Sequence, residues 1–313
     1  MKIFRNIDDI KGIKNAVVTT GSFDGVHVGH KVIINRLRKL ARMIGGESVL
    51  ITFHPHPRRV LYPETEGKEL LLINSQREKI ELLRKAGLDN LVIINFTKEF
   101  AQTTSLDFVK KILLEKVNAK KIIDGFNHYF GHNKEGNYNS LHDLAGENGF
   151  EVEEIPEQDI QNESVSSTKI RKALLEGDIQ RANAYLDHQY IIIGELTHGS
   201  EVCKNLGLPT MSVFIDEDIK LVPPQGVYAV SLICENDYFR GMLNIRNART
   251  HYQPHHPDTC IDMHVFDFEK HLVGKTATIF FHKKIREVKN FSNQDEMKNQ
   301  LIMDRNMIDE LIY

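Results

Sequence analysis

Residues 20–30 of the 313-residue chain read Thr20-Gly21-Ser22-Phe23-Asp24-Gly25-Val26-His27-Val28-Gly29-His30. The run before this stretch, Ala16–Thr20, is short and β-branched, which predicts a buried strand. After it, apolar residues recur at helical spacing among basic ones up to Arg42, which predicts an amphipathic helix. We expect a strand–loop–helix unit that cradles phosphate, because glycine lets the backbone approach the oxygens and a helix N-terminus offers free N–H groups.

His27 and His30 stand three residues apart, so both can face one ligand from the first turn of that helix. The stretch is not a Walker P-loop, because no Gly-Lys-Ser/Thr follows the glycines, and the dinucleotide fingerprint has no histidines at these places. It resembles the His-x-Gly-His signature of nucleotidylyltransferases, the alternative being a strand–helix turn with surface histidines. We expect His27 and His30 to be catalytic. The residues expected to bind the nucleotide are Gly21, Ser22, Phe23, Asp24, Gly25 and Gly29.

A second candidate element, Ser164–Arg171, precedes an apolar helical run. Serine and threonine before such a run are N-cap residues by default, and capping alone is the alternative interpretation. Three hydroxyls together with Lys169 and Arg171 at one helix start also suit an anion. Combined with the histidines, the element resembles the Ser-Ser-Thr-x-x-Arg segment that closes over ATP phosphates in the same superfamily. The resemblance implies a catalytic Arg171 and nucleotide contacts from Ser166, Ser167 and Thr168.

Length and composition narrow the class of protein. A chain of 313 residues suits two domains, and a net charge of −3 gives no electrostatic reason to expect nucleic acid or an anionic membrane. No apolar run approaches bilayer length, and the first residues do not resemble a signal peptide. Three widely spaced cysteines favour reduced thiols over a zinc site. We therefore expect a cytoplasmic protein without nucleic-acid or membrane partners.

The first part of the chain, residues 1–186, alternates short β-branched runs with helical runs, which predicts an α/β domain with a parallel sheet covered on both faces. Ligands of such sheets bind at the carboxyl ends of the strands, where the glycine–histidine loop stands. The expected strands are 16–20, 48–53, 90–96, 121–124 and 150–155, and the expected helices are 76–86, 106–117, 141–148 and 179–186.

The second part, residues 187–313, contains runs typical of strands with no long helix between them, which predicts an antiparallel barrel or sandwich. A closing helix is expected at about 295–311, and the domain boundary near residues 187–189. The expected strands are 189–196, 211–215, 226–234, 238–244, 259–268 and 277–282.

Two further loops of the first domain carry candidate ligand groups. Prolines end the strand at Thr52–Pro57, and its two histidines lack an acidic or cysteine partner for a metal, so we expect His56 to line the nucleotide pocket. Residues 124–137 mix aromatic rings, amides and glycines, which suits a planar ligand that needs stacking and fixed polar partners. A glycine-rich surface turn is the alternative there.

Four segments resemble, in order along the chain, the adenylyltransferase module of bacterial FAD synthetases. They are residues 21–30, residues 52–57, Phe130-Gly131 and residues 166–171. The resemblance implies a Rossmann-like nucleotidylyltransferase domain that transfers AMP from ATP, accompanied by Mg²⁺, to FMN, giving FAD and pyrophosphate. It assigns no metal ligand. The family favours Asp where Asn127 stands and Arg where Lys134 stands. Flavin contacts are expected from Phe126, Asn127, Tyr129 and Phe130.

The second domain resembles the riboflavin kinase module usually fused to that adenylyltransferase, on residues 206–210, 223–230, 264–268 and 274–275. Its kinase-like site would comprise Thr210, Ser212 and Asp262.

That kinase-like site departs from the family pattern at four places. Met211-Ser212 replaces Ala-Asn, and Cys203-Lys204 replaces Gly-Arg. Asp262 stands for the catalytic glutamate and is one methylene short, and a displacement of about 1 Å can cost on the order of 10²-fold in rate. The family's Asn-Ile-Gly-x-x-Pro-Thr loop reads Asn244–Thr250 without its glycine and proline. Together these changes predict lost or severely impaired riboflavin phosphorylation.

We therefore expect adenylyl transfer to FMN as the main reaction. An FMN phosphate oxygen is already ionised, so catalysis needs positioning and charge neutralisation rather than a protein base. Three alternatives stay open. A divergent but working kinase would make the protein fully bifunctional, because Asp262 and Thr210 keep a base and a metal ligand. A sister nucleotidylyltransferase acting on phosphopantetheine or nicotinamide mononucleotide would not explain the second domain. A flavin-binding regulator with a relic site is opposed by the intact motifs.

Overall fold

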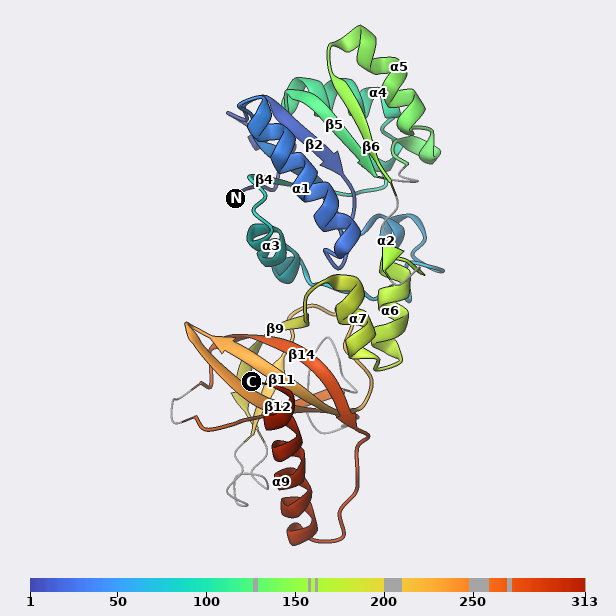
Figure 1. Ribbon diagram of the computed structural model, residues 1–313. Helices are drawn as coiled ribbons and strands as arrows, with labels where there is room; N and C mark the ends of the chain where they lie inside the picture. The colour runs from blue at the N-terminus through green and yellow to red at the C-terminus, as the bar shows by residue number, and fades with distance from the viewer. Residues whose placement is uncertain are drawn as a thin grey trace. The chain divides into compact units, whose positions relative to one another are not determined.

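The computed structural model describes residues 1–313 apart from 126–128, 157–158, 161–162, 200–209, 248–258, 269–271 and 313. The chain forms two compact units, whose elements are labelled in Figure 1. The first unit comprises Met1–Leu70 and Lys79–Val165, and the second comprises Leu71–Glu78 and Ser166–Tyr313. The functional boundary expected near residue 187 stays a prediction.

The first unit is built on a six-stranded sheet with the order β1-β4-β3-β2-β5-β6, in which every pair of neighbours runs parallel. This confirms the predicted parallel α/β architecture. We did not predict β1, whose three residues are too few to show a period and pair with β4 at the edge. The strands are β1 (Lys2–Phe4), β2 (Ala16–Thr20), β3 (Ser48–His54), β4 (Asn90–Asn95), β5 (Ala119–Gly125) and β6 (Glu151–Ile155).

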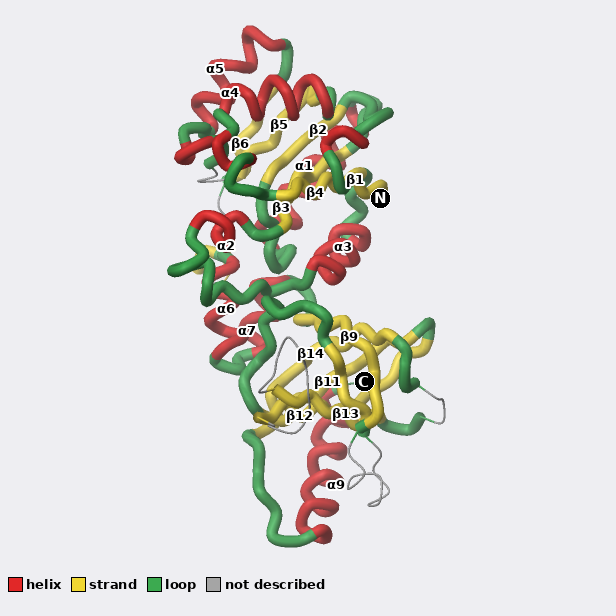
Figure 2. The backbone as a smooth tube through the Cα atoms, turned by 180° about the vertical axis from the view of Figure 1, so that it is seen from behind, coloured by secondary structure: helices red, strands yellow, loops and turns green. Residues whose placement is uncertain are grey.

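Helices cover both faces of this sheet, as Figures 1 and 2 show for α1 and for the stretch labelled α4. The helices described for this part of the chain are α1 (Val28–Met43), α2 (Pro57–Leu61), α3 (Gln76–Lys85), α4 (Ser105–Asp107), which continues as the π-helical η3 (Phe108–Lys116), and α5 (Tyr138–Asn148). Short elements complete the unit, namely the 3-10 turns η1 (Ile7–Asp9), η2 (Phe100–Gln102) and η4 (His132–Lys134) and the hairpin of β7 (Asp159–Ile160) and β8 (Glu163–Ser164).

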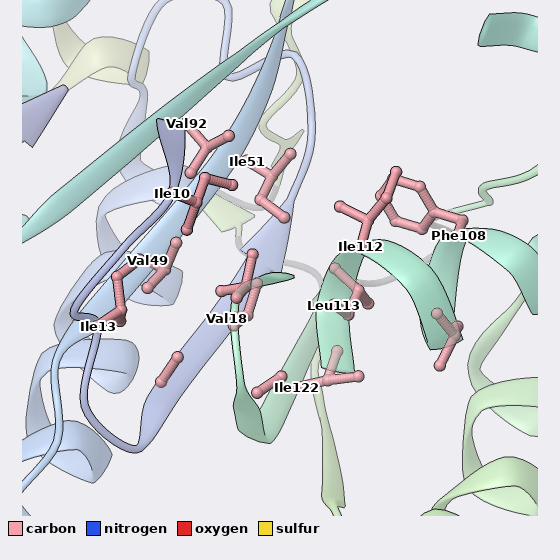
Figure 3. Packing of buried hydrophobic residues seen from close by; sticks show 14 of the residues in the cluster. Ile10, Ile13, Val18, Val49, Ile51, Val92, Phe108, Ile112, Leu113 and Ile122 are labelled. Carbon is pink, nitrogen blue, oxygen red and sulfur yellow. The ribbon is translucent and has the colours of Figure 1, made fainter. Parts of the chain in front are cut away.

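The alternation of side chains along β2 builds the two layers of core. Val17 packs with Leu37 and Leu40 of α1, whereas Val18 packs in the cluster that η3 covers. Figure 3 shows Ile112 and Leu113 of η3 beside the strand residues of that second cluster. Both faces of β2 are buried, its first three residues are apolar, and its carboxyl end lies at one edge of the sheet.

The second unit is a closed barrel of antiparallel strands with the order β10-β13-β12-β11-β14-β9, which selects the barrel from the two predicted alternatives. The strands are β9 (Tyr190–His198), β10 (Met211–Phe214), β11 (Gly226–Cys234), β12 (Asp237–Asn247), β13 (Thr259–Val265) and β14 (Thr276–Arg286). All six predicted strands are confirmed. No helix among the described residues has the length and apolar character needed to cross a membrane.

In the described part of the chain, the helices that lie wholly within the second unit are α6 (Ser167–Leu175), α7 (Ile179–Leu186) and α9 (Gln294–Leu311). The last confirms the predicted closing helix and lies beside the barrel (Figure 1). Its Ile308 joins Val227 and Met242 in a buried cluster. Its N-cap is Asn293, whose side chain accepts from Glu296 N at 2.9 Å.

A buried ion pair holds residues 71–78 within the second unit. Lys220 Nζ lies 2.7 Å from Glu78 Oε2, and both side chains are 0% exposed. Lys220 Nζ also donates to the carbonyl oxygens of Ile73, at 2.6 Å, and Ile191, at 2.9 Å. Such hydrogen bonds are what a buried charge pair requires. Sequence order alone does not show that Glu78 pairs with a lysine of the barrel.

Candidate active sites

The glycine–histidine loop leaves β2 at the carboxyl edge of the sheet and leads into α1, whose N-cap is His27. Strands β3 and β5 run parallel to β2 on either side, so their ends at His54 and Gly125 lie along the same edge. This is where open α/β sheets bind their ligands. The placement of the loop agrees with the expected strand–loop–helix cradle.

The backbone of this loop is tightly curled. Phe23, Gly25 and Val26 have φ angles of 47°, 95° and 45°, and a left-handed β-branched residue such as Val26 is a strained outlier. Two side chains hold this backbone conformation in place by donating hydrogen bonds to the Ser22 carbonyl oxygen. Thr52 Oγ1 donates at 3.2 Å and Lys79 Nζ donates at 2.7 Å. Strain of this kind persists only where the surroundings enforce it, and it is concentrated at functional sites.

The structure brings His27 and His30 together as stacked rings. Their centroids are 3.6 Å apart, and the Phe23 ring stacks on His30 with centroids 4.3 Å apart. His30 Nδ1 is buried and has no hydrogen-bond partner among the residues that the structure describes. Burial, aided by the charges of His27 and Lys79, holds the pKa of His30 well below its ordinary 6.5. His30 is therefore a neutral imidazole near pH 7, with a polar atom left for a ligand.

Lys79 is a candidate functional residue that we did not predict. It lies on α3, is only 3% exposed, and contacts the loop through the Ser22 carbonyl. Burial first, and then the charges of Lys79 and Arg5, lower the pKa of His54 at the neighbouring strand end. No sequence signal marks Lys79, since a lysine in an amphipathic helix ordinarily faces solvent.

Asp24 and His56 complete the predicted set at this edge. Asp24 is fully buried within the loop. His56 is the N-cap of α2, and its Nδ1 accepts from Arg58 N at 3.2 Å. No three His, Cys, Asp or Glu side chains gather as a metal site in the described part of the chain. The nucleotide contacts expected from Asp24 and His56 stay predictions.

The flavin residues are placed only in part. Phe126 and Asn127 lie outside the described residues. Tyr129 is 52% exposed, whereas the Phe130 ring packs on Phe108 with centroids 5.9 Å apart. Phe130 therefore belongs partly to the core, and Tyr129 offers the more open aromatic face.

The Ser166–Arg171 element lies in the second unit, at the start of α6. The Ser166 hydroxyl caps this helix by accepting from Lys169 N at 3.4 Å, as the capping interpretation expects. Arg171 Nε donates to the Leu71 carbonyl oxygen at 2.8 Å. Ser167 is half-buried and Thr168 is exposed, and the phosphate contacts expected from the element stay predictions.

The structure also brings Ser212 and Asp262 together, on the paired strands β10 and β13. Ser212 Oγ donates to Asp262 Oδ1 at 3.0 Å. Arg246 of β12 donates to Asp262 Oδ2 with Nε at 3.1 Å and with its terminal Nη2 at 2.9 Å. Cys260 Sγ lies 3.4 Å from the same oxygen, and burial, followed by the Asp262 charge, raises the pKa of this thiol to about 12. Thr210, half-buried, directly precedes β10.

Comparison with known proteins covers both units. Residues 9–169 match a family described as FAD synthetase, and residues 186–312 match one described as riboflavin kinase. Two curated relatives are each described as a bifunctional riboflavin kinase/FMN adenylyltransferase. The protein from Buchnera aphidicola subsp. Acyrthosiphon pisum is 32% identical over 97% of this chain and 96% of its own. The Bacillus subtilis protein is 32% identical over 93% and 90%.

A solved structure from Streptococcus pneumoniae, described as a macrolide-efflux protein, shares this fold over nearly its whole length. It is 27% identical, has a TM-score of 0.85, and the match covers 98% of this chain and 97% of that one. Each of these likenesses extends over more than nine tenths of the chain.

Proposed function

The chain belongs to the bifunctional riboflavin kinase/FMN adenylyltransferase family, and on that premise we propose that its main reaction is adenylyl transfer from ATP to FMN. The products are FAD and pyrophosphate. The observation that carries the proposal is the stacked pair of His27 and His30 at the carboxyl edge of the sheet, with a buried and unsatisfied His30 Nδ1.

The reaction demands little acid–base chemistry. A phosphate oxygen of FMN forms a bond to the α-phosphorus of ATP while the bond to pyrophosphate breaks. The attacking oxygen is already ionised, so no side chain has to remove a proton. Positioning and stabilisation of the growing negative charge supply the rate enhancement. Magnesium enters with ATP as part of the substrate, and it prefers phosphate oxygens and water to a protein cage.

The residues of the glycine–histidine loop fit these demands. The N-terminus of the 16-residue α1 offers N–H groups and a positive dipole end to the phosphates. A neutral His30 can donate one N–H to a phosphate oxygen without the desolvation cost of a buried cation. Lys79 adds a fixed positive charge behind the Ser22 carbonyl. We assign ATP phosphate contacts to Ser166, Thr168 and Arg171 on the resemblance alone.

We propose further that the barrel phosphorylates riboflavin poorly, because its candidate carboxylate, Asp262, is engaged by other side chains. Full bifunctionality is the second candidate. It is favoured by the riboflavin kinase match over residues 186–312 and by the pairing of Ser212 with Asp262. We place both reactions in the cytoplasm, where buried free thiols such as Cys234 and Cys260 are ordinary.

The direct test incubates the purified protein with ATP and FMN and separates the flavins by chromatography, with pyrophosphate measured in parallel. We expect FAD and pyrophosphate in equal amounts. Phosphopantetheine and nicotinamide mononucleotide serve as rival acceptors and should give no adenylylated product. A preparation that converts either rival but leaves FMN unchanged would contradict the assignment.

A further inference from the structure

Both oxygens of the Asp262 carboxylate accept hydrogen bonds from neighbouring side chains within the barrel. Oδ1 accepts from Ser212 at 3.0 Å, and Oδ2 accepts from Arg246 at 3.1 and 2.9 Å and faces Cys260 at 3.4 Å. The Asp262 side chain is 9% exposed and that of Arg246 is 32% exposed, so the carboxylate is nearly buried while the guanidinium is partly open to solvent. An Arg fork on a carboxylate is among the strongest polar contacts that proteins make.

Phosphorylation of a hydroxyl needs a proton acceptor at hydrogen-bond distance. The hydroxyl oxygen forms a bond to the γ-phosphorus of ATP, the bond from that phosphorus to ADP breaks, and the hydroxyl proton passes to a base. The base must offer an oxygen lone pair within about 3 Å of the hydroxyl. Each Asp262 oxygen already accepts a hydrogen bond from another strand, so a substrate hydroxyl has to compete with these donors for the lone pairs that remain.

Arg246 is the strongest of those donors and the only charged one among the described residues that contact Asp262. It lies on β12, and its neighbour Asn244 pairs in register with Asp262. Arg246 occupies a position at which the resembling family has a glycine, so the contact exists because this chain carries a side chain there. Ser212 is neutral, and the Cys260 thiol is a weak donor.

We propose that Arg246 is a positioning residue that holds Asp262 in an ion pair and thereby keeps this carboxylate from serving as the base in riboflavin phosphorylation. The inference rests on the proposed function and names the residue responsible for the weak kinase. Removal of Arg246 frees Asp262 Oδ2 for a hydroxyl, while the Ser212 hydrogen bond keeps the carboxylate in place.

The test measures FMN and FAD together, formed from riboflavin and ATP by the full-length protein, because FMN made in this mixture is itself adenylylated. Arg246→Met removes the charge at similar length and should raise the rate at least about tenfold, because a positioned base contributes on the order of 10²-fold or more. Arg246→Lys keeps the charge and should stay near the wild-type rate. Asp262→Asn in the Arg246→Met background should return the rate to the wild-type level. If Arg246 has only a structural role, none of these variants will phosphorylate riboflavin faster than the wild type.

Arg240 supplies a matched control on the same strand. Its Nη1 lies 3.1 Å from Asp309 Oδ1, and its side chain is 34% exposed, close to the exposure of Arg246. Arg240→Met should leave riboflavin phosphorylation unchanged. An equal gain in Arg240→Met and Arg246→Met would overturn the proposal, as would a wild-type protein that phosphorylates riboflavin as fast as it adenylylates FMN.

Two measurements keep the outcome decisive. If Arg246→Met does not melt cooperatively, Arg246→Gln carries the same expectation, since it is neutral and polar, and no gain in a folded neutral variant would overturn the proposal. Formation of FAD from FMN is followed in every preparation. Its absence in the wild type would refute the adenylyl transfer, whereas a missing gain in riboflavin phosphorylation would refute only the role of Arg246.

Discussion

His30 and Asp262 mark two regions of one chain that have kept their folds but differ in the state of their polar atoms. In the first unit, His30 Nδ1 is buried and has no hydrogen-bond partner among the described residues. In the second, both oxygens of Asp262 accept hydrogen bonds from other strands. The comparison teaches that two retained folds can present their polar atoms differently, and reactivity depends on which of these atoms the fold leaves for the substrate.

The two regions also differ in how they use positive charge. Lys79 is 3% exposed and donates to a backbone carbonyl at 2.7 Å, which holds the loop and lowers the pKa of His30. Arg246 forms an ion pair with the Asp262 carboxylate, so the two charges largely cancel. The first arrangement suits an anionic ligand, and the second resembles a structural ion pair.

The largest effect expected from a single substitution is on stability, at the buried pair of Lys220 and Glu78. Lys220→Met leaves the Glu78 carboxylate buried without its cation, which costs about 3–5 kcal/mol. The midpoint of urea unfolding of the second unit should fall accordingly, and Glu78→Gln in the same background should recover part of the loss. Lys275→Met, which breaks the exposed pair with Glu235, is the control and should change little. Equal losses in the two lysine variants would show that burial of the pair does not matter.

The next largest effect is expected on adenylyl transfer. His30→Ala should reduce FAD formation from FMN about 100-fold or more with the fold intact, because it removes a group placed to stabilise charge on the phosphates. The exposed His142 on α5 gives a control in the same unit, and His142→Ala should keep the full rate. Unchanged turnover in His30→Ala would remove the contrast between the two sites.

A smaller effect is expected at Lys79. Lys79→Met should lower adenylyl transfer about tenfold, because the loop loses its tie at Ser22 and the phosphates lose a nearby charge. Without that charge the pKa of His30 rises, so the acid limb of the pH–rate profile should move to higher pH. Lys85→Met, near the exposed end of α3, is the matched control. A lower rate with an unmoved acid limb would leave Lys79 a purely structural role.

The smallest effect is a dependence of stability on pH. The pKa of His30 is below 6.5 in the folded state, so the unfolded chain binds a proton between the two values that the folded protein does not bind. The free energy of unfolding therefore keeps its full value above pH 6.5 and falls as the pH drops below it. His30→Gln should lose less stability than the wild type between about pH 7 and about pH 5. The pKa values of His54 and His282 are also lowered, and they contribute equally in the wild type and in His30→Gln. Identical profiles of stability against pH in the two proteins would therefore contradict the account of His30.

Most of the fold could be predicted from the sequence, because strands such as Ala16–Thr20 and helices such as Val28–Met43 carry a clear period. The glycine–histidine loop was found for a similar reason, since its spacing is local. Side-chain pairs between distant segments could not be predicted. Nothing in the order of residues shows that Glu78 meets Lys220, or that Arg246 and Asp262 form an ion pair across the neighbouring strands β12 and β13.

The most direct measurement compares two rates in a single preparation of the wild-type protein. One reaction contains ATP and FMN, the other contains ATP and riboflavin, and the flavins of each are separated over time. We predict that FAD forms from FMN at least about 100-fold faster than FMN and FAD together form from riboflavin, as expected for a site whose base is engaged. Comparable rates in the two reactions would contradict the central claim that this chain has kept one chemistry and lost the other.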